Sequence, residues 1–165
     1  MGFACLPTPD LMCAGRKSNA TQEVLVESWR SCERARAWVE RSYKNSPAPP
    51  YESLNEEDWD QLEALSGRFA RLVDLIVHKL FRALDRYEFE ETISLLDSAN
   101  RAVKRGLVEN VDELRDLKDI RNEIVHEYSV EDVVSLHEDI YNAAPGLIAL
   151  VGKIGDYMAD RHGIY

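Results

Sequence analysis

The feature that most constrains the fold of this chain is a long apolar stripe between residues 62 and 84. Its members recur at every third or fourth position: Leu62, Leu65, Phe69, Leu72, Ile76, Leu80 and Leu84. This spacing places them near one face of an α-helix, which has about 3.6 residues per turn. Val73 and Val77 widen the face, as is typical of a helix that packs against several neighbours. The stripe therefore predicts a central helix that begins near residues 53–55.

Shorter stripes and boundary residues predict four more helices. The first begins at Asn19 and ends at the prolines at 47, 49 and 50, because proline lacks an amide proton. The others run from 90 to about 105, from 110 to 128 and from 129 past 158. Gly106 is expected at the C′ position that follows a helix. The last stripe keeps its phase across Pro145, which predicts one helix, kinked at that proline.

Together these elements predict an all-α fold, an up-and-down bundle of about five helices. A chain of 165 residues is long enough to bury the core of one domain. Residues 1–18 hold Pro7, Pro9 and Gly15 without any periodicity, so they are expected to form a flexible N-terminal tail. Residues 19–165 are then the helical domain.

The net charge of −10 argues against a general nucleic-acid coat protein, because phosphate affinity comes mainly from lysine and arginine. A site that acts on RNA must therefore be a local basic patch. The three cysteines, Cys5, Cys13 and Cys32, lack the spacing of metal ligands, which favours a reduced, cytoplasmic protein. No apolar run is long enough to predict a membrane span.

Residues 110–128 carry the motif with the most chemical content, R-N-E-I-V-H-E-Y at 121–128. At about 100° per residue, a helix over this range has three sectors. The apolar sector holds Leu114, Leu117, Ile124, Val125 and Tyr128, and the acidic sector holds Asp112, Asp116, Asp119, Glu123 and Glu127. The third sector holds Arg115, Lys118, Arg121, Asn122 and His126. A basic strip separated from carboxylates is suited to holding phosphate.

Arg121 and His126 are five residues apart, or about 140° around a straight helix. One straight helix does not direct both side chains to a single phosphodiester. Two copies of the helix about a dyad can pair the arginine of one chain with the histidine of the other. Fraying at Ser129 is another route, but the dimer is preferred, so a homodimer is expected.

The spelling R-x4-H-x-Y resembles the signature of HEPN domains, and most closely that of the HepT-like toxin ribonucleases. The resemblance implies cleavage of RNA at a dimer interface, without metal or cofactor. His126 is then the general acid or base, Arg121 stabilises the phosphorane-like oxygens, and Asn122 orients the histidine or a phosphate oxygen. Arg115 and Lys118 are expected to bind RNA phosphates. A minimal nucleotidyltransferase antitoxin is the implied partner, which neutralises such toxins by attaching AMP to the tyrosine at Tyr128.

Each residue of the motif also has a plainer interpretation. Arg121 alone fits an ion pair between helices, and His126 alone fits a helix end. Two other functions stay open: a non-catalytic helical subunit that binds a nucleotidyltransferase or its substrate, and a purely structural bundle. Outside the motif, His78 is expected in the core or at its edge, and His137 and His162 are expected in solvent.

Overall fold

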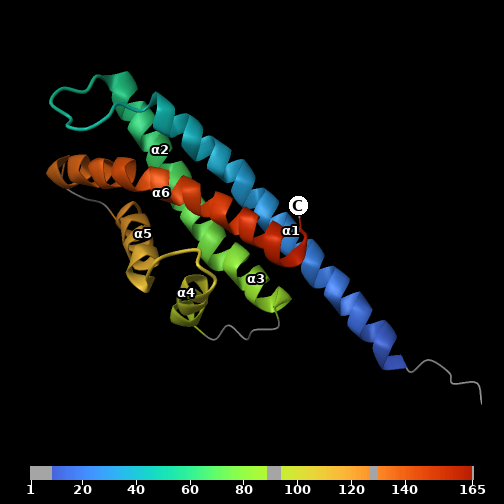
Figure 1. Cartoon of the computed structure of the whole chain (residues 1–165). Helices are drawn as coiled ribbons and strands as arrows, with labels where there is room; N and C mark the ends of the chain where they lie inside the picture. Colours follow the sequence, from blue (N-terminus) through green and yellow to red (C-terminus); the bar gives the residue numbers. More distant parts are fainter. Residues whose placement is uncertain (1–8, 89–93, 127–129, 165) are drawn as a thin grey trace, which may run out of the picture.

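The structure is a computed structural model that describes residues 9–88, 94–126 and 130–164. For residues 9–18 and 130–132 it describes the backbone alone. Its elements are α1 (Pro9–Asn45), α2 (Glu56–Leu75), the π-helical turn η1 (Ile76–Leu80), α3 (Phe81–Tyr87), α4 (Leu95–Lys104), α5 (Val111–Glu123) and α6 (Val130–His162) (Figure 1). Because α2, η1 and α3 follow one another without a break, the described residues form five helical units and no strand. The all-helical prediction is confirmed.

Two long helical rods set the shape of the molecule. Figure 1 shows α1 lying alongside the rod formed by α2, η1 and α3, with α6 packed across both. The shorter helix α5 packs on α2, α4 and α6, and α4 packs on α3. The motif helix α5 is therefore held against the central rod at one side of the molecule.

The core lies where the apolar faces of these helices meet. All seven members of the stripe from Leu62 to Leu84 are at most 1% exposed, as predicted. The six from Leu65 to Leu84 pack in one cluster with Leu25, Cys32 and Val39 of α1 and with the apolar face of α6. Burial also raises the pKa of the Cys32 thiol to about 12, because the thiolate is deprived of solvent.

The π-helical turn was not predicted, although its cause is visible in the sequence. Leu72, Ile76, Leu80 and Leu84 follow one another at steps of four residues. In a regular α-helix three such steps drift by about 120° and would turn Leu84 away from the core. The wider turn at Ile76–Leu80 takes up the excess, and all four side chains stay buried.

Local capping sets several helix ends. Asn55 caps α2 in a reciprocal box with Asp58, close to the predicted start. After α4, Gly106 has φ +71°, Leu107 N–H donates to Ala102 O, and Gly106 N–H donates to Val103 O. This is a Schellman motif, so the predicted C′ role of Gly106 is confirmed.

Three predicted boundaries are wrong. α1 begins at Pro9 rather than Asn19, so it includes half of the segment expected to be a tail. α4 begins at Leu95, because Ser94 caps it through the amide of Asp97, and not at residue 90. α5 ends at Glu123, several residues before Tyr128. By contrast, α6 is a single helix through Pro145, as expected. No helix in the described part of the chain is long and apolar enough to cross a membrane.

A buried polar network fixes α4 and the end of α6 to α3. Asp85 of α3 is fully buried, and Nη1 of Arg105 lies 2.6 Å from its Oδ1, although not aligned as a hydrogen bond. The same arginine donates through Nε and Nη2 to Oε2 of Glu88. His162 Nε2 and Tyr157 Oη reach the other oxygen of Glu88, at 2.7 and 2.8 Å. Burial alone would raise the pKa of Glu88, but the hydrogen bonds from Arg105, His162 and Tyr157 and the charge of Arg105 together lower it.

Candidate functional site

The motif lies at the C-terminal end of α5. Asn110 caps the helix through the amide of Glu113, and Leu114 and Leu117 bury its inner face. The helix ends at Glu123, and residues 124–126 form a turn and a bend. The helical angles used above therefore apply to Arg121 and Asn122 but not to His126. Tyr128, the expected modification site, lies outside the described residues.

Arg121 is engaged by a carboxylate of the central rod. Its Nη2 donates a 2.9 Å hydrogen bond to Oδ2 of Asp74. Its Nε lies 2.9 Å from Oδ1 of Asp74 without the alignment of a hydrogen bond, so the pair is not a symmetric fork. Nη1 donates to Oδ1 of Asn122 at 3.3 Å. This is the ion pair between helices that the plainer interpretation expected.

The contact with Asp74 leaves other N–H donors of the Arg121 guanidinium group unused. Arginine carries five N–H donors, and the two hydrogen bonds from Nη2 and Nη1 use one proton of each nitrogen. The side chain is 32% exposed, so the remaining donors on those nitrogens can meet a ligand from solvent. Asp74 thus fixes the orientation of Arg121 while part of its donor set stays available.

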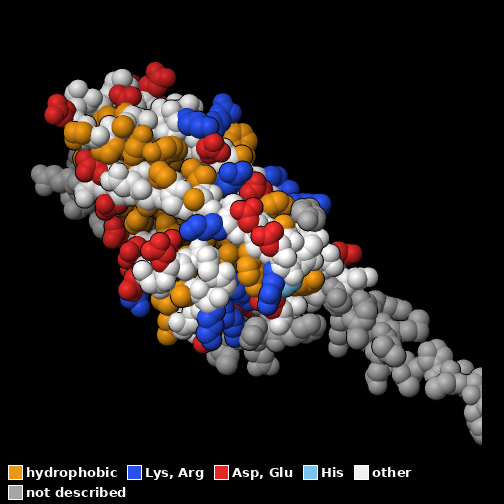
Figure 2. Space-filling model, in the orientation of Figure 1, with side chains coloured by type: hydrophobic (Ala, Val, Ile, Leu, Met, Phe, Trp, Pro, Cys, Tyr) orange, Lys and Arg blue, Asp and Glu red, His pale blue; other side chains and the backbone are white. Residues whose placement is uncertain are grey.

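The apolar and acidic sectors of α5 differ in how well they were predicted. Leu114 and Leu117 are buried, and Ile124 packs against the core. Val125 was expected on the same side, yet it is 67% exposed because the helix has already ended. The four described acidic residues, Asp112, Asp116, Asp119 and Glu123, are all exposed. Figure 2 shows acidic side chains gathered over α5.

The basic strip is less continuous than predicted. Arg115 pairs with Asp112 at 2.6 Å, so the two charge sectors meet at the start of the helix. Lys118 is half-buried and, with Arg115, borders an apolar groove of about 360 Å³ between α3, α4 and α5. Arg121 and Asn122 are bonded to each other, and His126 is exposed beyond the helix end. The structure thus brings Arg121 and Asn122 together and places Arg115 and Lys118 on another part of α5.

Neither of the two histidines expected in solvent is exposed. His137 is 6% exposed, and its Nδ1 lies 3.0 Å from Oγ of Ser66, which itself donates to Leu62 O. Burial lowers the pKa of His137. His162 bonds to Glu88, as described above. His78, expected in the core or at its edge, has a side chain that is 52% exposed.

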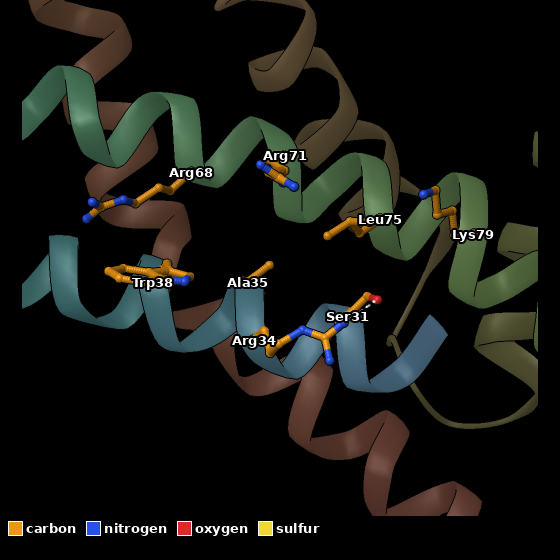
Figure 3. Close-up of a pocket in the computed structure, with 8 residues that line it drawn as sticks. All are labelled: Ser31, Arg34, Ala35, Trp38, Arg68, Arg71, Leu75 and Lys79. Atoms are coloured by element: carbon orange, nitrogen blue, oxygen red, sulfur yellow. Dashed lines mark hydrogen bonds between the residues drawn. The ribbon is translucent and has the colours of Figure 1, made fainter. Parts of the chain in front are cut away.

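Among the described side chains, no group of three histidine, cysteine or acidic residues could hold a metal ion. Sequence reasoning also missed a second group of positively charged side chains. They line a groove between α1 and the rod formed by α2 and η1, and they are Arg34, Arg68, Arg71 and Lys79 (Figure 3). The sequence signal for it was the spacing of arginines at Arg68 and Arg71, three apart in the central helix. The apolar stripe of that helix predicts its buried face but not the arrangement of its exposed cations.

Comparisons with known proteins identify no family. No protein-family model, curated protein or solved structure matches the chain. The HEPN resemblance therefore depends on the residues of the motif and on their surroundings.

Proposed function

We propose that this protein is a metal-independent endoribonuclease of the HEPN type and the toxin component of a toxin–antitoxin pair. The observation that carries the proposal is the R-x4-H-x-Y motif, whose Arg121 is partly exposed and oriented by Asp74. The proposal includes a homodimeric up-and-down bundle with α6 kinked at Pro145. The catalytic site is then shared across the dyad.

In this mechanism the ribose 2′-oxygen attacks the adjacent phosphorus. The 2′-O–P bond forms, the P–O5′ bond breaks, and the 5′-oxygen leaves with one proton. His126 takes the proton of the 2′-hydroxyl or supplies the proton to the 5′-oxygen, since an imidazole can both accept and donate a proton. The N–H groups of Arg121 that Asp74 and Asn122 do not engage stabilise the charge on the phosphorane oxygens.

In this mechanism the dimer brings together an arginine and a histidine that one chain does not direct to the same phosphodiester. Arg121 is fixed on α5 by Asp74, whereas His126 lies past the helix end. In the proposed dimer the second chain covers Val125, which is 67% exposed and next to His126. Light scattering at micromolar concentration should therefore give the mass of two chains. A monomer under conditions where RNA is cleaved would exclude the shared site.

The decisive experiment is cleavage of RNA by the purified parent and by His126→Ala, in the presence of EDTA. The parent should cleave and leave a 2′,3′-cyclic phosphate and a 5′-hydroxyl, and His126→Ala should be inactive with an unchanged circular dichroism spectrum. Lys153→Ala on α6 serves as a control that keeps activity. Activity lost in EDTA and restored by Mg²⁺ would exclude this mechanism.

Neutralisation is tested separately. Co-expression with a minimal nucleotidyltransferase encoded beside this chain should add the mass of AMP to the parent and relieve toxicity. Tyr128→Phe should stay unmodified and toxic. An AMP group at this place adds negative charge and bulk where an RNA phosphate has to lie. Relief of Tyr128→Phe toxicity by the same enzyme would show that neutralisation has another route.

The alternative function is a non-catalytic subunit that binds a nucleotidyltransferase. Two observations favour it: Asp74 partly neutralises Arg121, and Leu95 and Leu96 expose 38% and 55% of their surface at the apolar groove beside Lys118. Under this alternative His126→Ala is as toxic as the parent, and Leu96→Glu weakens binding of the nucleotidyltransferase. The ribonuclease proposal expects the opposite result for His126→Ala.

A further inference from the structure

A cationic groove runs between α1 and the central rod, away from the sequence motif. It has a volume of about 530 Å³. Figure 3 shows Arg68, Arg71 and Lys79 along the rod, facing Arg34 and Trp38 of α1. None of the side chains that line the groove is a carboxylate, although the whole chain carries a net charge of −10. The local excess of positive charge is therefore a property of this groove.

The cations at the two sides of the groove differ in how they are held. Nη2 of Arg34 pairs with Glu27 at 3.0 Å, and Nη1 of Arg68 donates to Oγ of Ser42. Among the described residues, Arg71 and Lys79 make no hydrogen bond or ion pair, and both are exposed. Two charges in the middle and at the end of the groove are thus available for an anionic ligand.

Trp38 provides an aromatic surface at the other end. Its side chain lies among cations, with the guanidinium carbons of Arg68 and Arg41 at 5.2 and 5.7 Å from the ring. The residue is nevertheless 51% exposed, so part of the indole is accessible to a ligand. Stacked arginine and tryptophan are the side chains on which nucleic-acid bases stack.

The π-helical turn lines up the cations of the rod. In a regular α-helix Arg71 and Lys79, eight residues apart, would point about 80° away from each other. Both line the groove, because the wider turn at Ile76–Leu80 rotates the chain less per residue. From Arg68 to Lys79 the row is eleven residues, or about 16 Å along the axis. Such a row can contact several phosphates rather than one.

We infer that this groove binds a single-stranded nucleic acid. The row of cations follows the phosphate backbone, and one base stacks at Trp38, which is the combination that single-strand binding proteins use. A mononucleotide leaves most of the row unused, and a flat anionic membrane does not enter a groove between two helices. An acidic peptide pairs with the cations but makes no use of an exposed indole.

The inference does not depend on the proposed cleavage reaction. It is nevertheless compatible with it, because Arg71 and Asp74 are three residues apart on α2 and therefore neighbours on its surface. Asp74 in turn holds Arg121. One turn of α2 thus links a residue of the groove to the residue that holds Arg121.

The test is binding of a dye-labelled single strand of about twelve nucleotides, measured by fluorescence anisotropy over a series of salt concentrations. The variants are Trp38→Ala, Arg71→Gln, and the double variant Arg71→Gln with Lys79→Gln. Lys153→Gln is the control, because it removes the same charge from an exposed position on α6, which does not line the groove. RNA and DNA strands of one sequence identify the preferred sugar, and binding of either supports the inference.

The double variant should weaken binding about tenfold or more. The affinity should also fall less steeply with salt: the negative slope of log K against log salt should decrease in magnitude by about 1.4, or about 0.7 for each lost phosphate contact. Trp38→Ala should weaken binding at least about fivefold. An abasic strand should bind the parent and Trp38→Ala with the same weakened affinity, because it has no base to stack on Trp38. Lys153→Gln should bind like the parent. The DNA strand has no 2′-hydroxyl and cannot undergo the proposed cleavage, so its binding is measured independently of the cleavage assay.

Three outcomes would overturn the inference. Equal losses of affinity for Arg71→Gln and Lys153→Gln would show that binding depends only on the net charge of the protein. Equal affinity for the abasic and the base-containing strand would make the groove a polyanion site without a role for Trp38. Binding to phosphatidylserine vesicles, with none to either strand, would assign the groove to a membrane surface.

Discussion

Arg121 of α5 and Asp74 of α2 join the sequence motif to the central helix through a 2.9 Å hydrogen bond from Nη2 to Oδ2. The two residues are 47 positions apart in the chain. Their side chains are 32% and 38% exposed, so solvent screens the charge interaction and it contributes little to the free energy of unfolding. The pair therefore matters more for the orientation of Arg121 than for the stability of the fold.

Replacing Asp74 by asparagine tests that role. Asp74→Asn should lower the free energy of unfolding by about 1 kcal/mol or less, as for other half-exposed ion pairs. In the proposed ribonuclease it should lower kcat, because the guanidinium is less well oriented, and lower KM, because a negative charge near the RNA is removed. Steady-state cleavage kinetics and urea unfolding measure these effects. An unchanged kcat would show that Asp74 does not position Arg121 for catalysis.

Replacing Asp85 should have a much larger effect on stability. Asp85 is fully buried beside Arg105, which is 6% exposed. Asp85→Ala removes a buried carboxylate that pairs with Arg105 and Arg101 and accepts from Ser98, and it leaves Arg105 paired with Glu88. The expected loss is about 3–5 kcal/mol in urea unfolding. Asp112→Ala is the matched control, since it breaks an exposed pair with Arg115 and should cost about 1 kcal/mol or less. Similar losses for both variants would contradict a structural role for the buried network.

His137 should make the fold sensitive to mild acid. Burial lowers the pKa of His137 in the folded state, so below about pH 6.5 the unfolded chain binds a proton that the folded chain does not. Stability from this residue is complete above that pH and falls as the pH decreases. His137→Gln should flatten the unfolding free energy between about pH 7 and 5.5. His78→Gln, at an exposed position, should leave the parent profile unchanged.

Two glycines of α6 should respond in opposite directions to alanine. A Cβ at Gly152 meets nothing within 4 Å, so Gly152→Ala should stabilise the helix by about 0.4–1 kcal/mol. A Cβ at Gly155 lies 3.1 Å from the ring of Trp29, which has to shift. Gly155→Ala should therefore be less stable than Gly152→Ala by about 1–3 kcal/mol in thermal unfolding. Equal stability of the two variants would mean that Trp29 moves freely.

Local patterns in the sequence were sufficient for much of the fold. The apolar stripe predicted the buried face of the central helix, and Asn55, Asn110 and Gly106 predicted helix ends that the structure confirms. Each of these signals lies within a few residues of the feature it predicts. The start of α1 at Pro9 was missed because proline is compatible with the first turn of a helix as well as with a tail.

Contacts between distant residues could not be predicted in this way. Periodicity shows which face of α5 carries Arg121, but not that Asp74 lies opposite. His137 was assigned to solvent because its partner, Ser66, is 71 residues away in the sequence. The cationic groove was missed because Lys79 falls out of line with Arg71 when α-helical geometry is assumed throughout. The roles of Arg121, Asn122, His126 and Tyr128 in catalysis and modification remain predictions from the motif.

The π-helical turn has a consequence for how the length of this chain can change. A turn at Ile76–Leu80 accommodates one residue more than the α-helical turn that could replace it. Loss of one residue there, such as His78, can close the turn to regular α-helix and leave the helices on both sides facing as before. The same deletion at Gly67 rotates everything that follows by about 100° and moves Asp85 away from Arg105. We therefore expect the central helix to accept the loss of one residue at this turn and not at Gly67.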